Sequence, residues 1–220
     1  MRGSLNLIDL KNSVKKVSRT NVKDFLIENR LLIFLSIMLL IGIFFGSMLI
    51  NFSDDQLIKF INTLFLSDFK ERLSKPLLDV FIASMSSTFI FVLMAFFMGL
   101  SVWGVILAPI IPFIRGICVG LCEAYLYTTF GLKGVCFHFL VFLPGIFISS
   151  IAVLLITREA IKISNCFYLS LQNSNKISSL SNNIKLYLIH SGSITIIIFI
   201  SSVIDLLSNV LFSKFFYFNL

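Results

Sequence analysis

The sequence predicts an all-α protein, a polytopic bundle of about five transmembrane helices. Three observations predict this class. The 220 residues are 57% hydrophobic and only 13% charged, whereas soluble domains are usually about 25% charged. Five apolar stretches approach or exceed the about 20 residues that a helix needs to cross a bilayer. The lysines and arginines flank these stretches, as they do in membrane proteins, so the net charge of +7 indicates a lipid bilayer as partner and not a nucleic acid.

The chain before the first span, residues 1–30, is basic and weakly amphipathic. This pattern fits a helix on an anionic cytoplasmic membrane surface, and it equally fits a solvated tail. Residues 31–220 are then expected to form one bundle. Its first span is predicted over residues 31–50 and should be a retained anchor, because no small-residue cleavage site follows it. Within it, Gly42 and Gly46 have a spacing that allows close helix packing.

A polar, amphipathic segment, residues 51–79, follows the first span. Four apolar residues in it share one face of a predicted helix, namely Leu57, Ile61, Leu64 and Phe65. We expect the segment to be helical and extracytoplasmic. It serves either to cover the bundle or to dock a partner protein, and in the second case these four residues are the candidate anchors.

Turns and a linker separate the remaining spans. Pro109 and Pro112 mark the turn before the third span, a glycine-rich turn precedes the fourth, and Pro144 with Gly145 is expected to kink the fourth. A Ser- and Asn-rich stretch, residues 158–187, is typical of a cytoplasmic linker. The predicted spans are 80–107, 108–130, 135–157 and 188–212.

The distribution of basic residues predicts the topology. Residues 1–30 hold seven lysines and arginines and the linker holds four, and with five spans both lie on one side of the membrane. The other side holds six, and its largest loop is net acidic. The N-terminus is therefore predicted to be cytoplasmic and the C-terminus extracytoplasmic, in the cytoplasmic (inner) membrane.

This topology makes a labelling prediction. In a variant without the native cysteines, a cysteine introduced at Ser67 should react with a membrane-impermeant thiol reagent in intact cells. A cysteine introduced at Ser179 should not, because the two positions are predicted on opposite sides of the bilayer. The reverse labelling pattern would contradict five spans with the N-terminus inside.

Four charged or histidine residues lie well inside apolar stretches: Arg115, Glu123, His138 and Asp205. Ionised groups in hydrocarbon are costly, so they usually mark a functional or packing site inside a bundle. A rise of about 1.5 Å per residue places Glu123, His138 and Asp205 at a similar depth in the outer half of the bundle. They form either a hydrogen-bonded cluster that fixes helix register or a cluster that gates a pathway or recognises a partner.

Two further expectations concern the third span. Gly116, Gly120 and Glu123 fall on one helical stripe, which predicts that Glu123 is buried at a tight helix interface. Arg115 lies nearer the cytoplasmic end of the span, and we expect its long side chain to reach the membrane surface.

Other classes of site lack support in the sequence. The chain has no H-E-x-x-H, G-x-S-x-G or Walker A motif, so we expect no catalytic residues and no enzyme activity. The four cysteines show no C-x-x-C spacing and no standard zinc pattern, so we expect no disulfide framework, metal or cofactor. Nucleic-acid-binding signatures are absent as well.

Around the third and fourth spans the chain resembles the bacterial stage II sporulation protein M family. The matching residues are 112–120 with Gly116 and Gly120, the turn 131–134, and 143–147 with Pro144 and Gly145. Many members carry a glutamate directly after this last motif, where this chain has Ile148. The resemblance implies a non-enzymatic membrane scaffold. In the family, this scaffold holds together the cell-wall hydrolases called stage II sporulation proteins D and P during engulfment of the forespore.

Two hypotheses from different classes follow. In the leading one, an integral membrane scaffold recruits extracytoplasmic wall hydrolases, the peptidoglycan-remodelling enzymes, through residues 51–79 and the outer turns. In the alternative, a permease-like subunit works as a homo-oligomer or with an ATPase subunit, and its polar pathway is lined by Arg115, Glu123, His138 and Asp205. An intramembrane enzyme without a known motif is a third option.

Overall fold

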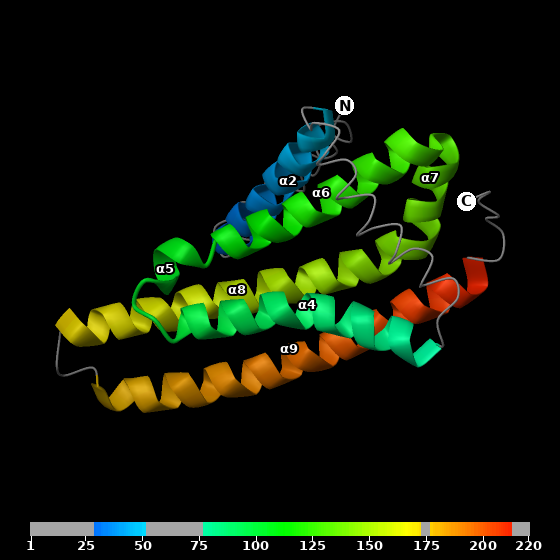
Figure 1. Cartoon of the computed structure of the whole chain (residues 1–220). Helices are drawn as coiled ribbons and strands as arrows, with labels where there is room; N and C mark the ends of the chain where they lie inside the picture. The colour runs from blue at the N-terminus through cyan, green and yellow to red at the C-terminus, as the bar shows by residue number, and fades with distance from the viewer. Residues whose placement is uncertain (1–28, 52–76, 173–176, 213–220) are drawn as a thin grey trace, which may run out of the picture. The chain divides into compact units, whose positions relative to one another are not determined.

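The structure is a computed structural model that describes residues 29–51, 77–172 and 177–212. Secondary structure in these ranges is entirely helical, and five helical stretches are long and apolar enough to cross a membrane (Figure 1). The prediction of an all-α, multi-pass membrane protein is confirmed. Most of the predicted basic tail and of the amphipathic segment 51–79 lies outside the described residues, including all four anchor candidates, Leu57, Ile61, Leu64 and Phe65.

The chain divides into two compact units, Met1–Phe34 and Leu35–Leu220, and the packing within the second unit positions the candidate site residues. In chain order the helices are α2 (Arg30–Asn51), α4 (Leu77–Gly99), α5 (Gly104–Leu107), α6 (Ile110–Phe130), α7 (Leu132–Phe137), the π-helical turn η1 (His138–Phe142), α8 (Leu143–Gln172) and α9 (Ile177–Phe212). The first and third predicted spans, 31–50 and 108–130, agree closely with α2 and α6.

The second predicted span, 80–107, is interrupted. α4 ends at Gly99, and residues 100–103 turn into the short helix α5. Side chains from α8 and α9 hold this turn: the Tyr187 hydroxyl donates to the carbonyl of Phe96 at 3.1 Å, and the Ser164 hydroxyl donates to that of Ser101 at 2.6 Å. The first bond satisfies a carbonyl that the end of α4 leaves open, and the second adds to the bond that the Gly104 N–H donates to the Ser101 carbonyl. The hydropathy pattern did not show the break because the turn itself is apolar.

The predicted linker, 158–187, is helical over most of its length. α8 continues to Gln172 and α9 begins at Ile177. Buried residues on both helices, including Ile163 and Tyr187, belong to the same apolar cluster as the mid-span residues. At about 1.5 Å per residue, the 36 residues of α9 extend over about 54 Å, whereas a hydrocarbon core is about 30 Å thick. The α8–α9 hairpin is therefore longer than one membrane crossing.

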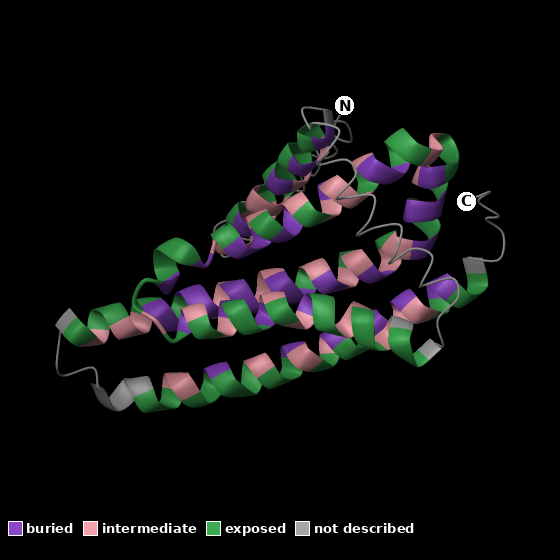
Figure 2. Ribbon diagram, in the orientation of Figure 1, coloured by how far each residue is buried: buried purple, intermediate pink, exposed green. Residues whose placement is uncertain are grey.

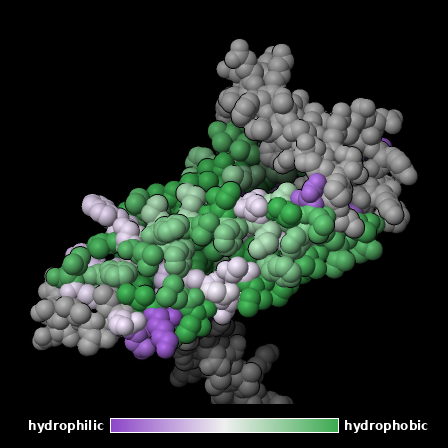
Figure 3. All heavy atoms as spheres, turned by 60° about the horizontal axis from the view of Figure 1, so that its bottom comes forward, coloured by the Kyte–Doolittle hydropathy of each residue, from purple (hydrophilic) through white to green (hydrophobic). Residues whose placement is uncertain are grey.

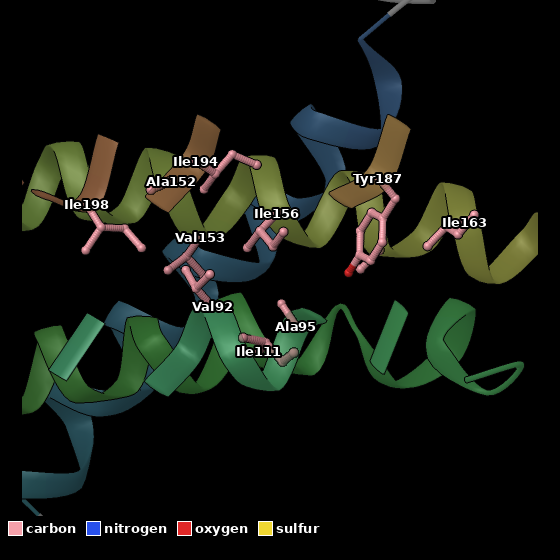
Figure 4. Close-up of a cluster of buried hydrophobic side chains, with 11 residues drawn as sticks. Val92, Ala95, Ile111, Ala152, Val153, Ile156, Ile163, Tyr187, Ile194 and Ile198 are labelled. Carbon is pink, nitrogen blue, oxygen red and sulfur yellow. The ribbon is translucent and has the colours of Figure 1, made fainter. Parts of the chain in front are cut away.

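The main apolar core lies between α4, α8 and α9, with one residue from α6 (Figure 4). It contains Val92, Ala95, Ile111, Ala152, Val153, Ile156, Ala160, Ile163, Tyr187, Ile194 and Ile198. In Figure 2 the exposed residues cover the outer sides of these helices, and Figure 3 shows one face on which hydrophobic side chains cover most of the described surface. Large apolar side chains on the outside are what a surface in contact with lipid requires.

The fourth span is irregular at the predicted position. Pro144 has no N–H to donate to the carbonyl four residues before it, and η1 lies immediately before α8 at this point. The chain changes direction between α7 and α8 (Figure 1). A π-helical turn next to a proline is a common cause of such a bend.

A buried polar cluster as the candidate functional site

A group of polar side chains is buried between the helices of the second unit. Nine of them come from α4, α6, η1, α8 and α9: Thr88, Arg115, His138, Ser149, Ser201, Ser202, Asp205, Ser208 and Asn209. All lie in or next to stretches whose hydropathy fits a membrane crossing. Buried polar groups need partners, and the partners they have define what the cluster does.

Arg115 is the centre of the first part of the cluster. Only 8% of this residue is exposed. Its guanidinium donates to the Ser149 hydroxyl on α8 at 2.9 Å and to the Thr88 hydroxyl on α4 at 3.5 Å, and it lies 5.3 Å from the centre of the Phe91 ring. These contacts join three helices and correct the expectation that Arg115 reaches the membrane surface. The hydroxyls and the aromatic face give the cation partners inside the bundle.

Asp205 on α9 supplies negative charge to this part of the cluster. It is 5% exposed and acts electrostatically on Arg115. Its side chain packs against Gly145 on α8, where an added Cβ would lie 2.9 Å from Asp205 Oδ1 and 2.7 Å from its Cβ. One turn earlier on α9, the Ser201 hydroxyl donates to the carbonyl of Gly145 at 2.7 Å. Gly145 therefore lets a carboxylate approach α8 closely, a role beyond the expected kink.

Glu123 acts electrostatically on His138. His138, in η1, is 4% exposed, and its Nδ1 has no hydrogen-bond partner in the described part of the chain. Glu123, in contrast, is exposed, which corrects the expectation that it is buried. The stripe of Gly120 continues by four residues to Ala124, which packs against a buried cluster around Tyr125. Glu123 is one position, about 100°, away from that face.

A protein family described as stage II sporulation protein M matches residues 32–206. The chain belongs to the stage II sporulation protein M family. The match includes Arg115, Glu123, His138 and Asp205 and extends from α2 into α9, far beyond the three short motifs that carry the resemblance in the sequence. No curated protein and no solved structure matches the chain.

Inside the region that matches the stage II sporulation protein M family, Gly42 and Gly46 on α2 and Gly116 and Gly120 on α6 lie where these two helices contact each other. A Cβ added at Gly116 would lie 3.0 Å from the Cα of Gly42 and 2.9 Å from the nitrogen of Ile43. One added at Gly46 would lie 2.9 Å from the Cα of Ile117. The contacts advance in the same direction along both helices, so α2 and α6 are parallel, as two spans separated by one other span must be. Glycine at these positions lets the two backbones touch.

Several residues of the cluster were not predicted from the sequence. Thr88, Ser149 and Ser201 are hydroxyl residues in apolar spans, a type too common to single out. One signal was present: Ser149 follows Gly145 by four residues and so shares its helix face. Within the described ranges of this member of the stage II sporulation protein M family, no three His, Cys, Asp or Glu residues are grouped so as to hold a metal ion.

Proposed function

We propose that this member of the stage II sporulation protein M family is a non-catalytic membrane scaffold that recruits extracytoplasmic peptidoglycan-remodelling enzymes. One observation carries the proposal. The buried guanidinium of Arg115 joins helices of the bundle to one another. It donates to Ser149 and Thr88 and lies in the electrostatic field of Asp205. Such a cluster fixes the arrangement of helices, which suits a platform. A transport pathway needs polar groups that meet a passing solute.

The proposed docking surface is the segment of residues 51–79 together with the outer turns. In the proposed topology this segment joins α2 to α4 on the extracytoplasmic side, where wall hydrolases act. The apolar stripe of Leu57, Ile61 and Leu64 has the spacing by which an amphipathic helix fills a groove on a partner.

The scaffold makes a prediction about this stripe. Changing Leu57, Ile61 and Leu64 together to serine should reduce co-purification of wall hydrolases in mild detergent at least about tenfold, since each buried leucine or isoleucine contributes about 1.5–3 kcal/mol. Membrane insertion should be unchanged, because the spans are untouched. The matched control is Leu171→Ser, an exposed leucine at the end of α8, which should co-purify hydrolases as the wild type does.

The permease alternative has one observation in its favour. In the described part of the protein, two buried nitrogens, Arg115 Nε and His138 Nδ1, have no hydrogen-bond partner. This alternative predicts that Arg115→Lys, which keeps the positive charge, abolishes transport although the variant is expressed at the normal level. The triple-serine variant should transport as the wild type does. If that result is obtained and an ATPase subunit co-purifies with the protein in place of wall hydrolases, the permease alternative replaces the scaffold proposal.

A further inference from the structure

Glu123 differs from the three other residues singled out inside the apolar stretches. Arg115, His138 and Asp205 are buried between helices, whereas Glu123 is exposed on a helix whose span, Gly104–Phe130, has a mean hydropathy of 2.2. Within the described ranges Glu123 makes no hydrogen bond or ion pair, and its electrostatic neighbour is His138. A carboxylate on the outside of an apolar helix is expensive unless something outside the helix compensates it.

The depth of Glu123 makes a surface location a poor explanation. α6 runs from Ile110 to Phe130, so at about 1.5 Å per residue Glu123 lies about 10 Å from one end of the helix and about 20 Å from the other. Long lysine and arginine side chains can extend their charge from such a depth to the membrane surface, but a glutamate has a shorter side chain. The carboxylate therefore remains among lipid chains unless a protein group meets it.

We propose that Glu123 is an intramembrane contact for a partner protein, and that the partner contributes a transmembrane helix with a lysine or arginine at the depth of Glu123. A basic side chain both neutralises the carboxylate and donates hydrogen bonds to it. This inference rests on the proposed scaffold function and deepens it, because it assigns one partner contact to the bilayer itself. Tyr127, exposed and one turn further along α6, extends the same face and can pack against the cation.

Charge complementarity favours a different protein over a second copy of this chain. In a symmetric pair with its axis along the membrane normal, equivalent residues lie at equal depth, so Glu123 would face Glu123 with like charge. The basic residue of α6, Arg115, is already buried against Ser149 and Thr88, so a second copy has no Arg115 side chain to offer. We therefore assign the basic side chain to a helix of a different protein.

A defined probe helix tests the proposal. The full-length protein, labelled with a fluorophore, is reconstituted in lipid vesicles with a labelled polyleucine helix that carries one lysine about 10 Å from its outer end. Energy transfer reports association. The lysine probe should bind about 3- to 20-fold more tightly than the all-leucine probe, the range that single polar contacts in membranes give. This preference should disappear in Glu123→Leu and persist in Glu159→Gln, which alters an acid paired with Lys162 and His190.

The unaltered protein supplies a second measurement, which does not depend on how Glu123→Leu folds. Moving the probe's lysine by two turns along its helix, which carries it past the membrane centre, should remove the preference. Equal binding of all probes, or self-association of the full-length protein that is lost in Glu123→Leu, would overturn the proposal. Such a result would leave the scaffold function to be decided by hydrolase co-purification with the triple-serine variant.

Discussion

Replacing Arg115 with methionine is expected to lower the free energy of unfolding by about 3–5 kcal/mol, the range for removing one member of a buried group of mutually bonded charged and polar side chains. The change removes the donor to Ser149 and Thr88. It also leaves Asp205, which is 5% exposed, without the positive charge that acts on it. The measurement is reversible unfolding of the purified protein in mixed detergent micelles, followed by circular dichroism.

A double-mutant cycle separates this pair from general damage. Arg115→Met and Asp205→Asn together should cost about 0.5–3 kcal/mol less than the two single changes added, because the two side chains act on each other electrostatically. The matched control is Lys162→Met, which breaks the exposed ion pair with Glu159 on α8 and should cost only about 0–1 kcal/mol. Strictly additive losses for Arg115 and Asp205 would show that the two residues do not interact.

Replacing Gly116 with isoleucine is expected to separate α2 from α6. The first carbon of the new side chain alone would lie 2.9 Å from the backbone nitrogen of Ile43 and 3.0 Å from the Cα of Gly42. Backbone atoms in a helix cannot rotate away as a side chain can, so the helices must move apart. We expect a loss of about 3 kcal/mol, at the upper end of overpacking effects, measured as a lower unfolding midpoint in detergent.

The chain contains a matched control for this change. Gly192, on α9, has no atom within 4 Å of an added Cβ, and Gly192→Ile should leave the unfolding midpoint nearly unchanged. A proximity test gives an independent result: the rings of Phe45 and Phe113 lie 6.1 Å apart across α2 and α6. Cysteines at these two positions should be joined by a short bifunctional maleimide in the wild-type background and not with Gly116→Ile. Efficient joining in both backgrounds would contradict the predicted separation.

Composition and periodicity predicted the helical class and the membrane spans because lipid imposes one strong rule. In hydrocarbon, backbone groups must be paired within the span, so a long apolar run has to be helical. That rule has no force outside hydrocarbon. The polar stretch 158–187 therefore gave no warning that α8 and α9 continue through most of it, and the apolar turn at 100–103 gave no warning that α4 ends at Gly99.

The candidate site was predicted in its residue types but not in its pairing. A charge inside an apolar run marked Arg115, Glu123, His138 and Asp205, yet depth along a helix says nothing about rotation around it. Arg115 points to α4 and α8, where Thr88 and Ser149 meet it, and Glu123, two turns later, is exposed. Which face of a helix meets a neighbour depends on packing between distant segments, and the pattern of apolar and charged residues along one helix does not reveal it.

The close contact of α2 with α6 has a consequence for how the protein is made. Gly116 leaves the ribosome roughly 70 residues after Gly42, which at about 5–20 residues per second is a delay of several seconds. During this time α2 has crossed the membrane with a bare glycine face and without the helix that covers it. Either the insertion machinery retains the nascent α2 until α6 arrives, or α2 diffuses in the bilayer and must be recaptured. In both cases the pair can form only after α6 has been made, so α2 must remain available until then.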